Sequence, residues 1–116
     1  MIIKVPFLKR TPFGSVLKNK ELDFVFNIAT LEDACNRMDI DFWQMSEVDG
    51  SDFALSVLYA AYIQGCKAKY KKPKYTFTHA VIWNQYMDKE SAEKVKEAMG
   101  DLFGKLKSGS DEVKKK

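Results

Sequence analysis

The segment from Asp52 to about Lys69 constrains the fold more than any other part of the chain. It predicts a helix with apolar or aromatic side chains almost all the way round: Phe53, Leu55, Val57, Leu58, Tyr59, Ala60, Ala61, Tyr62, Ile63 and Cys66. A helix without a clear polar face is buried on several sides. We therefore expect it at the centre of the fold, covered by the chain's other helices or by another subunit. Ser51 or Asp52 is the expected N-cap.

Further helices are predicted on both sides of this segment. Thr30, with Asp33 three residues later, resembles a capping box and begins a helix that reaches Met38. Thr78 caps a helix that ends near Tyr86, and Asp88 caps an amphipathic helix from Lys89 to about Lys107. A short aromatic turn at residues 42–45 brings the expected number of helices to four or five.

The first 27 residues are expected to be extended and rich in turns. The segment 2–5 reads as a strand, after which Pro6, Pro12 and Gly14 punctuate the chain. In the segment 22–26, apolar side chains alternate as in a half-buried strand. The expected product is a short antiparallel hairpin or a loose arm, which must lie against the helices or a neighbouring subunit.

These elements predict a mainly α fold, a small helical domain of four to five helices with a short N-terminal β-hairpin or extended arm. The expected single domain covers residues 1–107, with the arm at residues 1–27, and residues 108–116 form a disordered tail. A length of 116 residues allows one core. The hydrophobic fraction of 46% and the charged fraction of 30% are typical of a globular protein.

Few residues offer enzymatic chemistry, and we expect no enzyme, no cofactor and no metal. His79 is the single histidine and lies in the first turn of a predicted helix. Asp39 and Asp41 lack the rest of a calcium loop and more often cap or solvate a turn. With no secretory signal recognised, Cys35 and Cys66 are expected to be reduced, buried thiols. No apolar run is long enough to span a membrane.

The chain is rich in aromatic residues, with eight Phe, five Tyr and two Trp. Any one of them could simply fill the core, but the whole set exceeds what a small core comfortably holds. Exposed aromatic patches usually mark protein interfaces. The predicted partner-binding residues are Phe42, Trp43, Phe53, Tyr59 and Tyr62.

A basic patch follows the central helix, and its members are Lys67, Lys69, Lys71, Lys72 and Lys74. Most such clusters are solvated helix ends, and some dock an acidic partner. Because Tyr70 and Tyr75 interleave with the lysines, a small nucleic-acid-binding regulator is the alternative function. Acidic residues dominate the region 30–52, which disfavours a helix-turn-helix there and makes nucleic acid the less favoured partner.

The blocks 24–35, 38–41, 56–62, 66–67 and 75–77 resemble the small tail assembly chaperones of long-tailed bacteriophages and prophages. The resemblance covers about residues 22–85 and rests on apolar patterns; the first 20 residues and the lysine-rich end lie outside it. It implies a mostly helical, homo-oligomeric protein of the bacterial host cytoplasm, without catalytic residues. Its implied partners are other tail proteins and the tape measure protein, whose hydrophobic helices it keeps soluble. It also implies a longer frameshifted form, with which Lys114, Lys115 and Lys116 are compatible.

Overall fold

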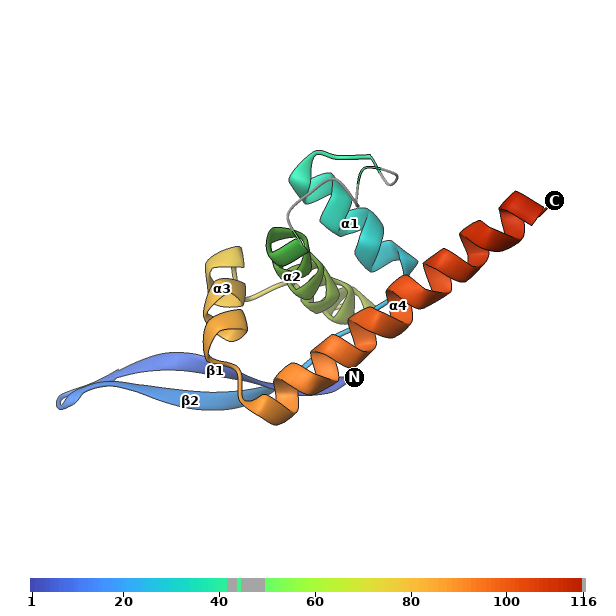
Figure 1. Ribbon diagram of the computed structural model, residues 1–116. Coiled ribbons are helices and arrows are strands. Elements are labelled where there is room, and N and C mark those ends of the chain that lie inside the picture. The colour runs from blue at the N-terminus through green and yellow to red at the C-terminus, as the bar shows by residue number, and fades with distance from the viewer. Residues whose placement is uncertain (42–43, 45–49, 116) are drawn as a thin grey trace.

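The computed structural model describes residues 1–41, 44 and 50–115. Two strands, β1 (Ile2–Thr11) and β2 (Gly14–Asp23), precede the helices α1 (Ile28–Met38), α2 (Gly50–Ala68), α3 (Phe77–Tyr86) and α4 (Lys89–Lys115). Figure 1 shows α2 in the middle of the helical body, with the hairpin projecting from one end and α4 from the other. The molecule is accordingly elongated, with principal extents of 63 × 30 × 27 Å.

The two strands form an antiparallel hairpin whose register pairs Ile2 with Asp23 and Thr11 with Gly14. Residues 12 and 13 make the turn, and Gly14 has a φ of 120°, a backbone conformation that favours glycine. The Thr11 hydroxyl closes the turn by donating to the Gly14 carbonyl at 2.6 Å. A tight turn therefore joins two strands of equal length.

The predicted fold class was mainly α with a short hairpin or extended arm. It is wrong because the sheet is larger than predicted. The structure is 59% helical, but each strand has ten residues, as many as helix α3, so the described fold is α+β. Pro6 does not interrupt β1, because each strand of a two-stranded sheet has an open edge where a missing N–H breaks no ladder.

The predicted strand at residues 22–26 is also displaced, since β2 ends at Asp23. The Phe24 N–H still follows the register of the hairpin and donates to the Met1 carbonyl at 2.8 Å. The next N–H leaves the hairpin, since Val25 donates to the Ala61 carbonyl of α2 at 3.0 Å. The chain after β2 is therefore fastened to the central helix.

The N-cap of α1 is Asn27, three residues before the predicted Thr30. The Thr30 N–H donates to Asn27 Oδ1 at 3.0 Å, and the Asn27 N–H donates to Thr30 Oγ1 at 3.2 Å. This reciprocal pair is a capping box in which Thr30 is the third helical residue. Asp33, the predicted capping-box acid, instead pairs with Arg37 one turn later, at 3.2 Å.

The other helix starts show mixed agreement with the sequence. Ser51 and Asp52 lie inside α2, which begins at Gly50. The N-cap of α3 is Thr76, two residues before the predicted position. Asp88 caps α4 as predicted, because its Oδ1 accepts the N–H of the third helical residue, Ser91, at 2.7 Å. Helix α4 runs to Lys115, past the predicted end and through the segment expected to be a disordered tail.

The prediction that α2 is central is confirmed, since ten of its residues are buried. One core cluster joins α2 to the base of the hairpin, α3 and α4: Ile3, Val5, Phe24, Leu58, Tyr59, Ala61, Tyr62, Ile63, Ala80, Trp83 and Val95. A second joins α2 to α1 and α4: Leu31, Ala34, Cys35, Phe53, Val57, Ala60 and Leu102. Every described element thus packs on α2 directly or through one of these clusters.

At Gly65, helix α2 is approached very closely by the end of β2. A Cβ placed on Gly65 would lie inside the contact distance of the Asp23 carbonyl oxygen and 2.9 Å from the Asp23 carbonyl carbon. The close neighbour of α2 at Gly65 is therefore backbone from the hairpin and not a second helix.

Candidate functional site

The predicted aromatic binding surface does not form on this fold. Phe53, Tyr59 and Tyr62 are only 5%, 8% and 4% exposed, because α2 is covered on several sides. Phe53 packs against Phe103 of α4, with ring centroids 6.0 Å apart. Phe42 and Trp43 lie outside the described residues. The prediction that Phe53, Tyr59 and Tyr62 supply an accessible surface is therefore wrong for the folded chain.

The two buried tyrosines hold the loop that follows α2. The Tyr62 hydroxyl accepts the N–H groups of Lys74 and Tyr75 at 2.8 and 3.1 Å. The Tyr59 hydroxyl donates to the Tyr75 carbonyl at 3.0 Å. Burial, together with the neighbouring Cys66, raises the pKa of the Tyr62 phenol. These hydroxyls thus satisfy backbone groups of the loop and give it a fixed course.

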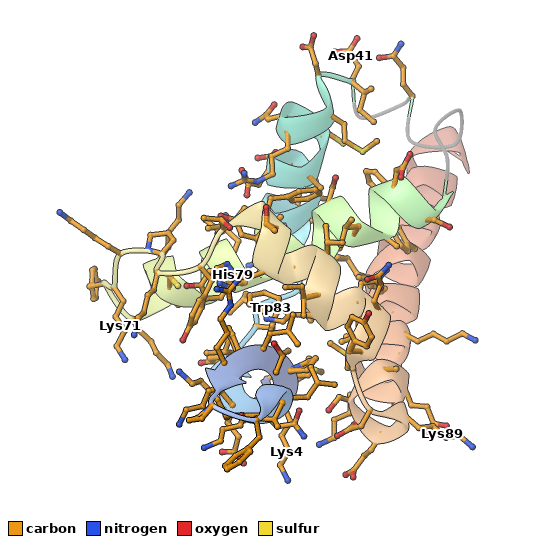
Figure 2. All side chains as sticks on the ribbon, turned by 90° about the vertical axis from the view of Figure 1, so that its left-hand side faces the viewer. Lys4, Asp41, Lys71, His79, Trp83 and Lys89 are labelled. Carbon is orange, nitrogen blue, oxygen red and sulfur yellow. The ribbon has the colours of Figure 1, made fainter. Side chains whose placement is uncertain are left out.

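The predicted basic patch is exposed, and the hairpin extends it. All its lysines but Lys67 line an open hollow of about 320 Å³ between α2, the loop after it and β2, together with Glu21 and Asp23. Lys69 pairs with Asp23 at 3.1 Å, whereas Lys74 lies 5.8 Å from the ring centroid of Tyr75. Lys20 of β2 lies 5.3 Å from the ring centroid of Phe7, which in turn packs on Tyr75 at 4.6 Å. The patch therefore continues onto the sheet, on the side marked by Lys71 in Figure 2.

His79 closes the capping box of α3. Its Nδ1 accepts the Thr76 N–H at 3.2 Å, and the Thr76 hydroxyl lies 3.1 Å from the same nitrogen. The ring also packs beside Tyr75 and Phe7, with centroids 5.2 and 5.9 Å away. Figure 2 shows His79 near Trp83, between α3 and the hairpin. These contacts give His79 a structural role at the start of α3.

The two cysteines are both free thiols in different surroundings. Cys35 of α1 is buried, and that burial, with the charges of Asp41 and Glu32, raises the pKa of its thiol. Cys66 of α2 is only half-buried, so the expectation of two buried thiols holds for Cys35 alone. A raised pKa keeps the Cys35 thiol protonated near neutral pH.

The outer half of the hairpin, residues 8–18, is the surface that the sequence did not reveal; we call it the hairpin arm. It projects beyond the helices in Figure 1. Its Leu8 and Leu17 are directly paired across the strands, yet they are 55% and 48% exposed. Phe13 in the turn is fully exposed, and Val16 is also exposed. The arm also carries Lys9, Arg10 and Lys18 but no acidic residue.

One sequence signal could have located this arm. Leu8 and Leu17 lie at equal distances from a Pro12-Phe13 turn, as paired residues of a hairpin do. Apolar side chains paired across a sheet usually face a core. Leu8 and Leu17 are instead about half exposed and belong to neither core cluster, so the arm is an apolar, basic projection open to solvent.

A second open surface lies beside α4, and we call it the α4 groove. It has a volume of about 730 Å³ and is lined by Met1, the segment 24–28, Ala98, Asp101 and Leu102. Met1 and Ile28 on its rim are both exposed, whereas Phe24 and Leu102 on its floor are buried. Its lining is thus mainly apolar, with a carboxylate at one side.

Models of protein families, curated proteins and solved structures were compared with the chain, and none of them matches it. None of the described helices is both long and apolar enough to cross a membrane. Within the described ranges, no group of three or more His, Cys, Asp and Glu side chains could hold a metal ion. The arm, the α4 groove and the basic patch are therefore the surfaces from which a function must be argued.

Proposed function

We propose that this chain is a non-enzymatic chaperone of phage or prophage tail assembly, which self-associates and binds the tape measure protein in the host cytoplasm. The proposal rests on the resemblance of residues 22–85 to tail assembly chaperones. One structural observation supports it: the hairpin arm holds four large apolar side chains, Leu8, Phe13, Val16 and Leu17, in exposed positions. Apolar groups gathered on one projecting element are characteristic of protein-binding surfaces.

The physical cost of leaving this arm exposed favours a protein partner. Burying apolar surface contributes roughly 25 cal/mol of favourable free energy per Å². A partner that covers Leu8, Leu17 and Phe13 therefore binds with the free energy of removing these side chains from water. Both strands of the hairpin also have an open edge, to which an extended segment could add as a further strand. Since Phe53, Tyr59 and Tyr62 are buried, the arm and the α4 groove replace them as the proposed contact surfaces.

Co-expression with a tape measure protein of a long-tailed phage tests the proposal. We expect the chain to raise the soluble fraction of that protein, and the double variant Leu8→Ser, Leu17→Ser to lose most of this gain. Tyr70→Ser is the control, because Tyr70 is also exposed but lies in the loop after α2. If the wild-type chain leaves the solubility of the tape measure protein unchanged, the proposal is wrong.

Nucleic-acid binding is the second candidate, favoured by the continuity of the basic patch with Lys20 on the sheet. The fully exposed Tyr70 could stack on a base, while Lys71 and Lys72 contact phosphates. Retention on heparin or DNA that weakens steeply with salt, and weakens further in Lys71→Ala, Lys72→Ala, supports this function. Indifference to DNA at low salt removes it.

A further inference from the structure

The geometry points to one mode of self-association: the hairpin arm of one copy docks into the α4 groove of a second copy. This inference deepens the proposed function and rests on its self-association part. It gives both open surfaces, the hairpin arm and the α4 groove, the same binding partner, a second copy of the chain. The observations that carry it are complementary charge, complementary apolar lining and the separation of the two surfaces on the molecule.

The arm supplies an apolar tip with a positive rim. Phe13 projects fully exposed from the turn, and Arg10 and Lys9 lie two and three residues before the turn. The arm contains no acidic side chain that could neutralise them. It is also rigidly held at its base, where Phe7 packs against Tyr75 and Trp83 with centroids 4.6 and 5.9 Å away. The arm therefore presents its charge and its aromatic ring in a fixed direction.

The α4 groove supplies the matching surface. Its lining is mainly apolar, and Asp101 stands at its side. Glu97 lies one helical turn before Asp101 and Glu93 one turn before Glu97, so the three carboxylates form a stripe along one side of α4. Among the described residues, the ion pair of α4 joins Lys94 to Glu90 at 3.8 Å, and the stripe has no cation partner. An apolar tip with cations fits this groove, because Asp101 at its side, with Glu97 one turn away, can then pair with arm cations.

The sizes of the two surfaces are compatible. A strand advances by about 3.3 Å per residue, so the four residues from Leu8 to Thr11 carry the turn roughly 13 Å beyond Phe7. The groove, at about 730 Å³, lies within the range of roughly 300–1,000 Å³ that accommodates compact ligands. A single aromatic side chain and its turn can therefore enter it without rearrangement of the helices.

The placement of the surfaces makes the contact intermolecular. In Figure 1 the arm projects away from the helical body, while the N-terminus and the middle of α4, which border the groove, lie within that body. With its base packed in the core, an arm cannot reach the groove of its own chain. Docking of one surface into a different surface is heterologous, so successive copies add head to tail and close into a ring or continue as a filament.

Two single-surface variants and their mixture test the inference by analytical ultracentrifugation of the full chain. Phe13→Ser with Arg10→Glu disables the arm, and Glu97→Lys with Asp101→Lys disables the groove. Each variant alone is expected to associate at least about tenfold more weakly than wild type. Mixed together, they retain one intact arm and one intact groove, so we expect a 1:1 complex that grows no further. That regain also shows that both variants are folded.

A charge exchange within one chain provides the sharper test. Arg10→Glu combined with Asp101→Arg reverses both sides of the contact, and we expect it to restore association that either single reversal loses. Lys71→Glu, a reversal in the basic patch, is the matched control and leaves association unchanged. If the arm variant associates as wild type does, the docking is overturned. If the arm variant is no longer retained on DNA but associates as wild type does, the arm binds nucleic acid, and the docking is likewise overturned.

The outcomes separate this inference from the proposed function. Wild-type chain that stays monomeric at high concentration overturns both the docking and self-association, whatever the tape measure result. Association that persists without the arm, together with increased solubility of the tape measure protein, overturns the docking alone. Loss of association in both single-surface variants, regained in their mixture, supports the docking even if the tape measure protein proves not to be the partner.

Discussion

The close approach of β2 to Gly65 gives the sharpest test of how the hairpin is attached. In Gly65→Ala the new Cβ would overlap the Asp23 carbonyl oxygen and lie 2.9 Å from the carbonyl carbon, whereas ordinary contact begins near 3.4 Å. Both atoms belong to backbone, so neither can rotate away. The end of β2 must therefore move outward from α2, which strains the neighbouring hydrogen bond from Val25 to the Ala61 carbonyl.

The expected loss follows from two opposing contributions. Overpacking of a tight contact costs typically 1–3 kcal/mol, and more where backbone must move. Alanine in a helix recovers up to about 1 kcal/mol relative to glycine. We expect a net loss of about 2 kcal/mol in the free energy of unfolding. For a chain of 116 residues, this lowers the melting temperature by about 8 °C.

Thermal unfolding followed by circular dichroism measures this shift, and Gly100→Ala provides the control. A Cβ at Gly100 meets nothing within 4 Å, so the same substitution there is expected to raise the melting temperature by up to about 4 °C. Amide exchange at Val25 should accelerate in the Gly65 variant and stay unchanged in the control. A Gly65→Ala protein as stable as wild type, with Val25 protected, would refute the close approach.

Three further predictions concern single side chains. Asn27→Ala removes the cap of α1 and should cost about 1 kcal/mol, whereas Asn36→Ala, inside the same helix and exposed, should slightly stabilise in the same denaturant titration. The hydrogen bond from the Met1 ammonium, together with the Lys69 ammonium, lowers the pKa of Asp23 below its ordinary value of 3.8. The ionised Asp23 carboxylate therefore stabilises the fold above that pH, and this stabilisation is lost as the pH falls through the lower pKa of the folded state. Asp23→Asn should flatten the acid limb of a plot of stability against pH, and an unchanged limb would contradict the pairing. The buried Trp83 Nε1 has no hydrogen-bond partner among the described residues. In urea melts, Trp83→Phe should therefore lower the free energy of unfolding by about 1–2 kcal/mol, against about 3–5 kcal/mol for Trp83→Ala. Equal losses for the two variants would show that the indole N–H contributes nothing unfavourable.

The sequence predicted best the features that depend on local pattern. The central place of α2 follows from a helix without a polar face, and the Asp88 cap follows from an acid directly before an amphipathic run. The start of α1 was ambiguous, because both Asn27 and Thr30 can cap a helix. The reciprocal bonds between Asn27 and Thr30 show that Thr30 already lies inside the helix, and its hydroxyl donates to the Val25 carbonyl at 2.6 Å.

The features that were missed depend on contacts between distant segments. Pro6 suggested an end to β1, but a two-stranded sheet tolerates it, and Pro6 is in fact fully buried. The composition showed a surplus of aromatic residues without showing which of them the core absorbs. Phe53, Tyr59 and Tyr62 are buried because α1, α3, α4 and the hairpin base converge on α2. The exposed aromatic residues include Phe13 and Tyr70, and the neighbours of Phe13 in sequence carry no interface signal.

The division of one hairpin into a buried base and an exposed arm gives a gradient of local stability within single strands. Backbone amides beside Ile3 and Val5 are covered by the core, so their hydrogens should exchange with solvent only when the whole molecule unfolds. Amides around Phe13 need only a local fraying of the turn. A protease should therefore nick the free arm first. The two halves of the nicked chain would remain associated through the core, and the loss of the turn would separate binding by the arm from the integrity of the fold.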